Sequence, residues 1–245
     1  MSNIVNVAWM YPDILNLHGE RGNAKAFELV SKKTGVKLNI DRIDDIDSNI
    51  NYENYDILLF NAGELKHIEK VKERLKNDID KIKEYLKKNK IIFVTGTTGA
   101  LFAHNIDRLD GSSFNGLNLL DMDVKERNMV FGDDLYYKFE KMEIMSSQIQ
   151  MIDITLNKAK EFGKIIYGYG NDGKTEGARS KNLLFTNALG PVLVKNPWLT
   201  EYLINLALKN KGLKEISKKI DFDLELKSLE SAKKFINKKI ENEKN

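Results

Sequence analysis

The chain has 245 residues, of which 42% are hydrophobic and 31% are charged. This length suits one large domain, or one domain with a helical extension, because domains usually contain roughly 100 to 200 residues. No segment approaches the roughly 18 uninterrupted apolar residues of a membrane-spanning helix, so we expect no membrane insertion. The 39 Lys and Arg residues nearly balance the 36 Asp and Glu residues, which does not favour a nucleic acid as partner.

Cysteine is absent, which excludes disulfides, thiolate metal ligands and a cysteine nucleophile. The first residues lack a basic segment followed by an apolar run, so we expect no signal peptide and a cytoplasmic protein. No histidine and carboxylate spacing suggests a metal site, and we expect neither a metal nor a cofactor.

Short apolar runs alternate with helical patterns, which is typical of an α/β fold with a mostly parallel sheet. We predict strands at residues 4–9, 36–40, 57–60, 91–94 and 183–187. One helix is predicted across residues 68–86 and another across residues 197–210. The first of these has three- and four-residue spacing of Ile68, Val71, Leu75, Ile79, Ile82 and Leu86, and its alternating charges indicate a solvated face.

The middle and the end of the chain have different compositions. Residues 111–181 are rich in Gly, Asn and Asp, which predicts antiparallel strands and long loops at one end of the sheet. We predict one domain over residues 1–210 and a charged helical extension over residues 211–245. Candidate docking points of this extension are Ile216, Ile220, Leu224 and Leu226.

The strongest local feature is residues 91–102, where an apolar strand enters a turn with two glycines. This pattern is typical of a nucleophile elbow, in which a strained turn exposes a side chain beside the amino terminus of a helix. The amide groups there can hold an anion or oxyanion, so Gly96, Thr97 and Gly99 are candidate binding residues. An ordinary turn capped by Thr97 or Thr98 is the alternative.

Residues 11–23, which begin Tyr11-Pro12-Asp13 and end Arg21-Gly22-Asn23, resemble the amino-terminal signature of CobB/CobQ-like class I glutamine amidotransferases. Within that group, the segment is most similar to the GatD subunits of lipid II isoglutaminyl synthase. The resemblance continues in order at residues 116–121, 168–177 and 189–197. It implies a three-layer, flavodoxin-like fold and a subunit that passes ammonia from glutamine to a MurT-like Mur ligase. That partner uses ATP to activate the D-glutamate α-carboxyl of the peptidoglycan stem peptide.

The sequence departs from this family at the catalytic positions. The family's cysteine follows the strand directly, where Thr95 stands here, although matching the second glycine selects Thr98 instead. Leu189 replaces the catalytic histidine before the Gly-Pro pair, and the oxyanion loop is altered around Gly63. A hydroxyl needs an adjacent base to attack an amide, and Leu189 cannot act as one. Removing one member of such a pair lowers turnover on the order of 10⁴-fold.

Five other residues are candidates for a site. His104 lies too far down the helix after the elbow to reach either threonine, and His18 belongs to the signature loop. His67 follows the third strand, where a surface position is the simpler interpretation. Arg127 and Lys195 are candidate anion contacts, with a surface role as the alternative for each.

Three hypotheses follow. The first is a degenerate GatD-like subunit without glutaminase activity that acts as a scaffold or regulator of a Mur ligase. The second is an active glutaminase subunit with Thr95 or Thr98 as nucleophile. The third is a small-molecule binding module whose pocket holds glutamine or another ligand. In all three, we expect the elbow threonine and Leu189 to face each other across the pocket.

Overall fold

The structure, a computed structural model, describes residues 4–243. Within these residues, six strands form a central sheet in the order β11-β12-β4-β3-β1-β2. All neighbouring strands are parallel except the edge strand β11, which runs antiparallel to β12. These strands are β1 (Ile4–Met10), β2 (Lys37–Ile43), β3 (Ile57–Phe60), β4 (Ile91–Thr95), β11 (Ala178–Ser180) and β12 (Leu183–Thr186). The predicted α/β class with a mostly parallel sheet is confirmed.

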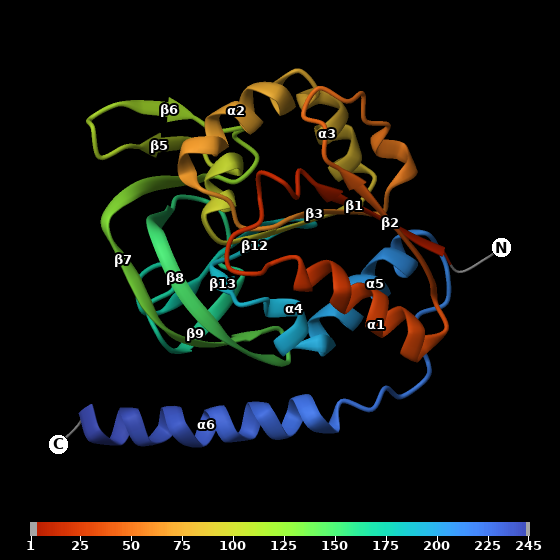
Figure 1. Cartoon of the computed structure of the whole chain (residues 1–245), viewed down its shortest axis with the longest axis vertical. Helices are drawn as coiled ribbons and strands as arrows, with labels where there is room; N and C mark the ends of the chain where they lie inside the picture. The colour runs from red at the N-terminus through yellow and green to blue at the C-terminus, as the bar shows by residue number, and fades with distance from the viewer. Residues whose placement is uncertain (1–3, 244–245) are drawn as a thin grey trace.

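Helices cover both faces of this sheet and complete three layers (Figure 1). One face carries α2 (Leu65–Lys76) and α3 (Ile79–Lys87), and the other carries α1 (Gly22–Thr34), α4 (Val192–Lys195) and α5 (Pro197–Asn210). Successive strand residues point to opposite faces, so Leu58 and Phe60 pack in one hydrophobic core and Ile57 and Leu59 in the other. This two-sided burial explains the nearly continuous apolar runs of the central strands.

The single helix predicted over residues 68–86 is in fact two helices, α2 and α3, because the chain breaks at Asn77 and Asp78. The Asp78 carboxylate is buried at this break, where it accepts bonds from Arg74 at 2.7 Å and Lys81 at 2.8 Å. The Tyr52 hydroxyl, in the short 3-10 helix η1 (Tyr52–Asn54), also donates to Asp78, at 3.2 Å. The apolar spacing continues across the break, so the pattern alone did not reveal it.

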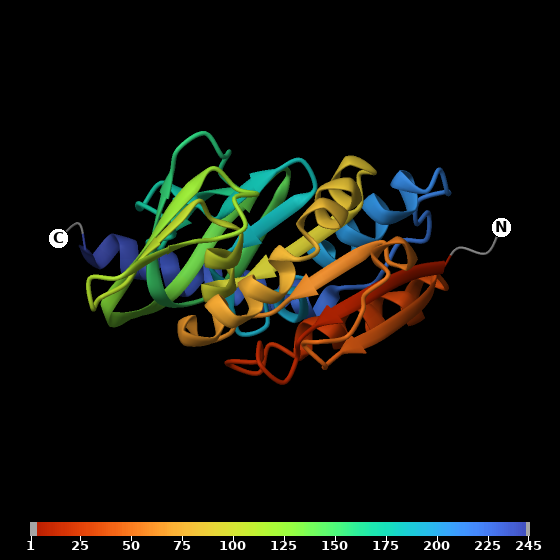
Figure 2. The ribbon, with the colours of Figure 1, turned by 90° about the horizontal axis from the view of Figure 1, so that it is seen from above.

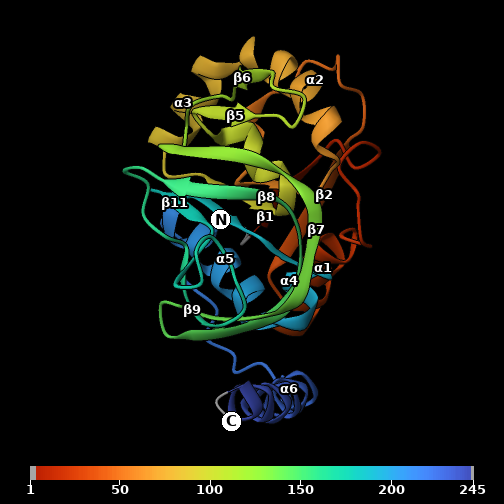
Figure 3. The same cartoon turned by 90° about the vertical axis from the view of Figure 1, so that its left-hand side faces the viewer.

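Residues 111–181, for which we predict antiparallel strands, supply most of a second sheet, whose first and last strands in chain order come from outside this range. This sheet consists of β5 (Asn105–Asp107), β6 (Ser113–Asn115), β7 (Met122–Phe139), β8 (Met142–Leu156), β9 (Gly163–Tyr167), β10 (Thr175–Glu176) and β13 (Ala188–Leu189). The long antiparallel pair β7 and β8 lies beside the central sheet (Figure 2), and β7 bends strongly along its length (Figure 3). Strand β13 pairs with β8 and thereby fixes Leu189 next to the central sheet.

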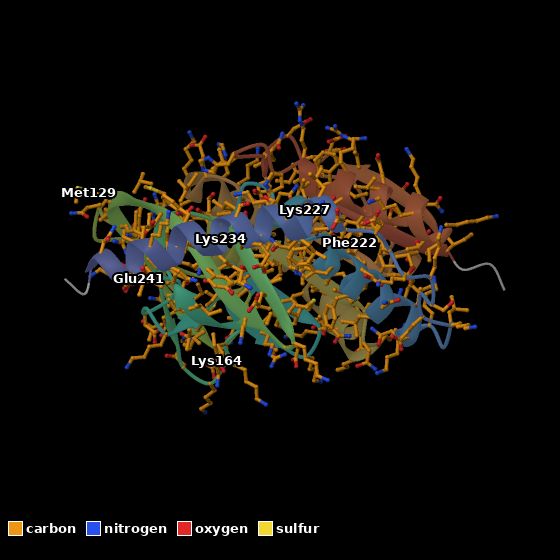
Figure 4. The ribbon with its side chains drawn as sticks, turned by 90° about the horizontal axis from the view of Figure 1, so that it is seen from below. Met129, Lys164, Phe222, Lys227, Lys234 and Glu241 are labelled. Carbon is orange, nitrogen blue, oxygen red and sulfur yellow. The ribbon has the colours of Figure 1, made fainter. Side chains whose placement is uncertain are left out.

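After α5, the chain continues into the helix α6 (Asp223–Glu243), which lies outside the rest of the molecule in Figure 1 and crosses its lower face in Figure 4. It docks through Leu229 and Ile236, which pack with Tyr136 and Met145. Ile216 and Ile220 pack on the core as expected, but Leu224 and Leu226 are 78% and 48% exposed and do not dock. The domain boundary at residue 210 stays a prediction. Within residues 4–243, no helix is both long and apolar enough to span a bilayer.

Candidate functional site

The elbow is formed by the end of β4 and the 3-10 helix η2 (Gly96–Phe102). Gly96 turns the chain with φ of +59°, a left-handed conformation that glycine adopts without the penalty of a side chain. A Cβ atom on Gly96 would lie 2.8 Å from Cδ2 of Leu189 and 2.9 Å from Cβ of Ala62. The position that faces Leu189 and the loop after β3 is therefore Gly96, and not Thr95 as expected.

Thr95 is the last residue of β4, and its hydroxyl donates to Oε2 of Glu20 at 3.1 Å. Both residues are fully buried. Strand alternation explains the direction, because Ile91 and Phe93 point into the core on the α1 side and Thr95 continues their row. The Thr95 hydroxyl is consequently part of an internal hydrogen-bond network.

Glu20 is the centre of that network. Its Oε2 also accepts from Nδ2 of Asn23 at 2.6 Å, and its Oε1 accepts from the amide of Gly190 at 2.7 Å. Burial raises the pKa of Glu20 above its ordinary value, although the bonds from Gly190 and Thr95 act in the opposite direction. The carboxyl group therefore joins three distant segments: the loop before α1, the end of β4 and the start of the segment after Leu189.

Asn23 extends the network in two directions. Its Nδ2 donates to Oδ1 of Asn61 at 3.1 Å, and its Oδ1 accepts from the amide of Leu193 at 2.9 Å. Sequence analysis missed Glu20, Asn23 and Asn61 as interacting residues. The available signal was that Glu20 and Asn23 lie inside the amino-terminal signature, where polar side chains next to a helix start are candidates for buried contacts.

Thr98 connects the elbow to the loop after β3. Its hydroxyl donates to the carbonyl of Asn61 at 2.7 Å and accepts from the amide of Gly63 at 2.9 Å. The Gly63 amide, which belongs to the expected oxyanion loop, is thus already bonded within the protein. A Cβ on Gly63 would lie 2.4 Å from Cδ2 of Leu15, so this glycine allows the signature loop to pack closely.

The other residues predicted for the turn are also enclosed. A Cβ on Gly99 would lie 2.2 Å from the ring of Phe185, which explains this glycine by packing. Thr97 is 7% exposed, and all residues of η2 are buried. Leu189, at 1% exposure, closes the side of the elbow that faces it. The described elbow is therefore a filled site and not an open pocket.

The remaining candidates make their contacts elsewhere. Arg127 forms an ion pair with Asp153, and its guanidinium lies over the rings of Phe131 and Tyr169 at 5.5 and 5.6 Å. These contacts hold it on β7, at an irregularity of the β7–β8 pairing between Glu126 and Phe131. Lys195 donates to Oγ of Ser147 at 3.0 Å, close to Gly190.

The three histidines lie outside the elbow. His104 is exposed and its Nδ1 lies 3.3 Å from Asp123, and His18 is exposed in the loop before α1. His67 lies in the first turn of α2, half-buried, and its Nδ1 is enclosed without a hydrogen-bond partner among the described residues. Within residues 4–243, no group of three or more acidic, histidine or cysteine side chains is arranged to hold a metal ion.

This arrangement of a parallel sheet, an elbow after β4 and a closing segment at Leu189 matches a known class of fold. A crystal structure of a glutamine amidotransferase superposes with a TM-score of 0.54 at 15% identity, covering 82% of this chain and 98% of that one. The fold is therefore that of the glutamine amidotransferases, as predicted.

Two curated proteins make the similarity more specific. The chain is 27% identical over 232 residues to the GatD subunit of the glutamine-hydrolyzing lipid II isoglutaminyl synthase of Staphylococcus aureus strain N315, covering 88% of this chain and 89% of that one. It is 25% identical over 224 residues to the corresponding GatD subunit of Streptococcus pneumoniae strain ATCC BAA-255 / R6, covering 84% and 82%. No protein-family model matches the sequence. The chain is thus GatD-like along most of its length.

Proposed function

We propose that this chain is a GatD-like subunit that has lost glutaminase activity and serves as a scaffold or regulator of a MurT-like Mur ligase. Its similarity to two GatD subunits over most of their length supports a role in the amidation of a peptidoglycan precursor, the D-glutamate of lipid II. The expected cytoplasmic location is part of the same proposal. The observation that carries the loss of activity is the apolar contact between Gly96 and Leu189.

The geometry of this contact supports Gly96 as the residue that stands at the nucleophile position of the elbow. A nucleophile there needs the strained left-handed turn and a base within hydrogen-bond reach. Gly96 has the turn but no side chain, and the side chain opposite is the hydrocarbon of Leu189. Neither covalent attack nor proton transfer is available to this pair.

The alternative of an active glutaminase with a threonine nucleophile is less well supported. The Thr95 hydroxyl donates to the carboxylate of Glu20, and a hydroxyl beside a carboxylate is a chemically possible pair of nucleophile and base. Both residues, however, are inaccessible to solvent. The Thr98 hydroxyl is bonded to the backbone at Asn61 and Gly63. A substrate amide would have to displace these buried bonds, and leaving such groups unpaired costs about 1–3 kcal/mol for each.

A third function, binding of glutamine or another small molecule at the elbow without turnover, requires space at that place. The side chain of Leu189 occupies the volume next to Gly96, and every residue of η2 is buried. The elbow therefore has less free volume for a ligand than a site that had lost only its catalytic side chains.

The test is ammonia release from glutamine by the purified chain, alone and with a co-expressed Mur-ligase-like partner, beside Thr95→Ala and Thr98→Ala variants. We expect no release in any sample. Amidation by the partner should proceed with ammonium salts and should depend on this chain for its rate or for the stability of the complex. Glutamine-dependent release that either substitution abolishes would contradict the proposal and favour a threonine nucleophile.

A further inference from the structure

A small cavity lies between α6 and the amidotransferase-like domain, apart from the elbow. Its volume is about 150 Å³, and its walls include Leu229, Ala232, Phe235 and Ile236 from α6 and Ser146 and Lys195 from the domain. Figure 4 shows α6 crossing this face of the molecule. None of the elbow residues lines the cavity, so it is a separate feature of the structure.

The side of the cavity formed by α6 is mostly apolar, with Ser228 as the polar residue in its lining. Leu229 and Ile236 are buried there against Met145, which also lines the cavity. An enclosed apolar cavity of about 150 Å³ holds a molecule of about six carbon atoms, so this cavity has room for a hydrocarbon part of that size beside its polar groups. A hydrocarbon group of that size would therefore contact the apolar side chains of α6 without displacing any side chain from the cavity.

The opposite side carries the ammonium group of Lys195, which interacts electrostatically with the carboxylates of Asp134 and Glu20 but is not in direct contact with either. Within residues 4–243, Lys195 has one hydrogen-bond partner, Ser147, and forms no ion pair within 4.0 Å. Asp134 also lines the cavity, but its Oδ2 already accepts from Nζ of Lys239 at 3.0 Å. An ammonium group has three N–H donors, so Lys195 keeps donors for a ligand. Lys195 is exposed, which gives a ligand access at this polar end.

We propose that this cavity binds a small monocarboxylate, with its carboxylate on Lys195 and its hydrocarbon part against α6. One cation and an apolar wall of this size fit one anionic group joined to about six carbons better than an uncharged molecule or a polyanion. Such a ligand would connect α6 to the domain beside the segment that carries Leu189, because Ser146 donates to the carbonyl of Leu189. The inference does not depend on the proposed function.

The test uses the full chain and two probes of equal chain length, hexanoate and 1-hexanol, titrated by calorimetry and by NMR. We expect hexanoate to bind with a Kd on the order of 1 mM, as ligand efficiencies for molecules of this size allow. We expect 1-hexanol to bind about tenfold more weakly, since it lacks the charge-assisted bond to Lys195.

Three variants assign the site. Lys195→Met should weaken hexanoate about tenfold and leave 1-hexanol nearly unchanged, whereas Lys164→Met, which removes an exposed lysine of β9, should change neither. Ala232→Phe should fill the cavity and abolish binding of both probes while circular dichroism shows an intact fold. Absence of saturable hexanoate binding, equal affinity for the two probes, or binding that survives Ala232→Phe would each overturn the proposal.

Discussion

At the scale of single residues, one backbone angle decides which side chain faces the site. The strand and its glycines were predictable, because β4 is an apolar run and the turn carries Gly96 and Gly99. The sequence does not reveal which residue takes the left-handed conformation, so counting from the strand selected Thr95. Nor could it reveal Glu20 as the partner of Thr95, since 75 positions separate them and their contact exists only in the folded chain.

The first prediction concerns restoration of the two missing groups. An Ala62→Gly background removes the Cβ atom that a Cβ at position 96 would meet at 2.9 Å. In that background, we expect the double variant Gly96→Cys, Leu189→His to release ammonia from glutamine at least about tenfold faster than either single variant, because a thiol and an imidazole would then lie in contact. The matched control is Thr95→Cys with Leu189→His, in which the thiol points toward Glu20. Equal rates for the two double variants would show that the choice of Gly96 over Thr95 is wrong.

The second prediction concerns pH. Burial raises the pKa of Glu20 above its ordinary value of 4.5, so the folded state holds this proton more tightly than the unfolded state does. Glu20 therefore lowers the free energy of unfolding progressively as pH rises from about 4.5 through the raised folded value. We expect Glu20→Gln to reduce this decline without removing it, because burial also raises the pKa values of Glu176 and Glu201.

Urea unfolding of the two proteins from about pH 4 to about pH 8 measures this slope directly. Glu69→Gln, on the exposed side of α2, is the control and should keep the wild-type slope. An unchanged slope in Glu20→Gln would mean that this carboxyl group titrates normally.

At the scale of elements, the apolar pattern predicts the bounds of a strand that is buried on both faces and of a helix that begins at a proline. The residues of β3 and α5 were predicted correctly, since β3 is buried on both faces and α5 begins with Pro197. The break between α2 and α3 was missed, because it depends on Asp78 and its contact with Tyr52 from another part of the chain.

The third prediction follows from that break. Asp78→Ala should lower the free energy of unfolding by about 2–4 kcal/mol, since it leaves the half-buried Arg74 without its carboxylate partner. Asp80→Ala, on the exposed side of α3, should change it by less than about 0.5 kcal/mol. Thermal and urea unfolding of both variants provide the comparison, and similar losses in the two would exclude Asp78 as the residue that stabilises this break.

At the scale of the whole molecule, the 21-residue helix α6 packs on the domain through the buried side chains of Leu229 and Ile236. The fourth prediction is that Ile236→Ala will release it, because Ile236 is 1% exposed and burying such a side chain contributes about 2–5 kcal/mol. Limited proteolysis and hydrogen exchange should then show faster cleavage and exchange in α6 alone. Phe235→Ala changes the neighbouring residue, which is 56% exposed, and should leave α6 protected. Protection in both variants would mean that the ion pairs of Lys233 and Lys239 suffice to dock the helix.

The contact between Gly96 and Leu189 also determines how the chain responds to reactive chemicals. Electrophilic glutamine analogues and oxidants act on a thiolate at this place in enzymes that use cysteine. Here the side chain of Leu189 packs against the backbone of Gly96, and the sequence contains no cysteine. Thiol-directed glutamine analogues will therefore find no thiolate to label in this protein, so any inactivation that they cause in a mixture identifies a different polypeptide as the source of the ammonia.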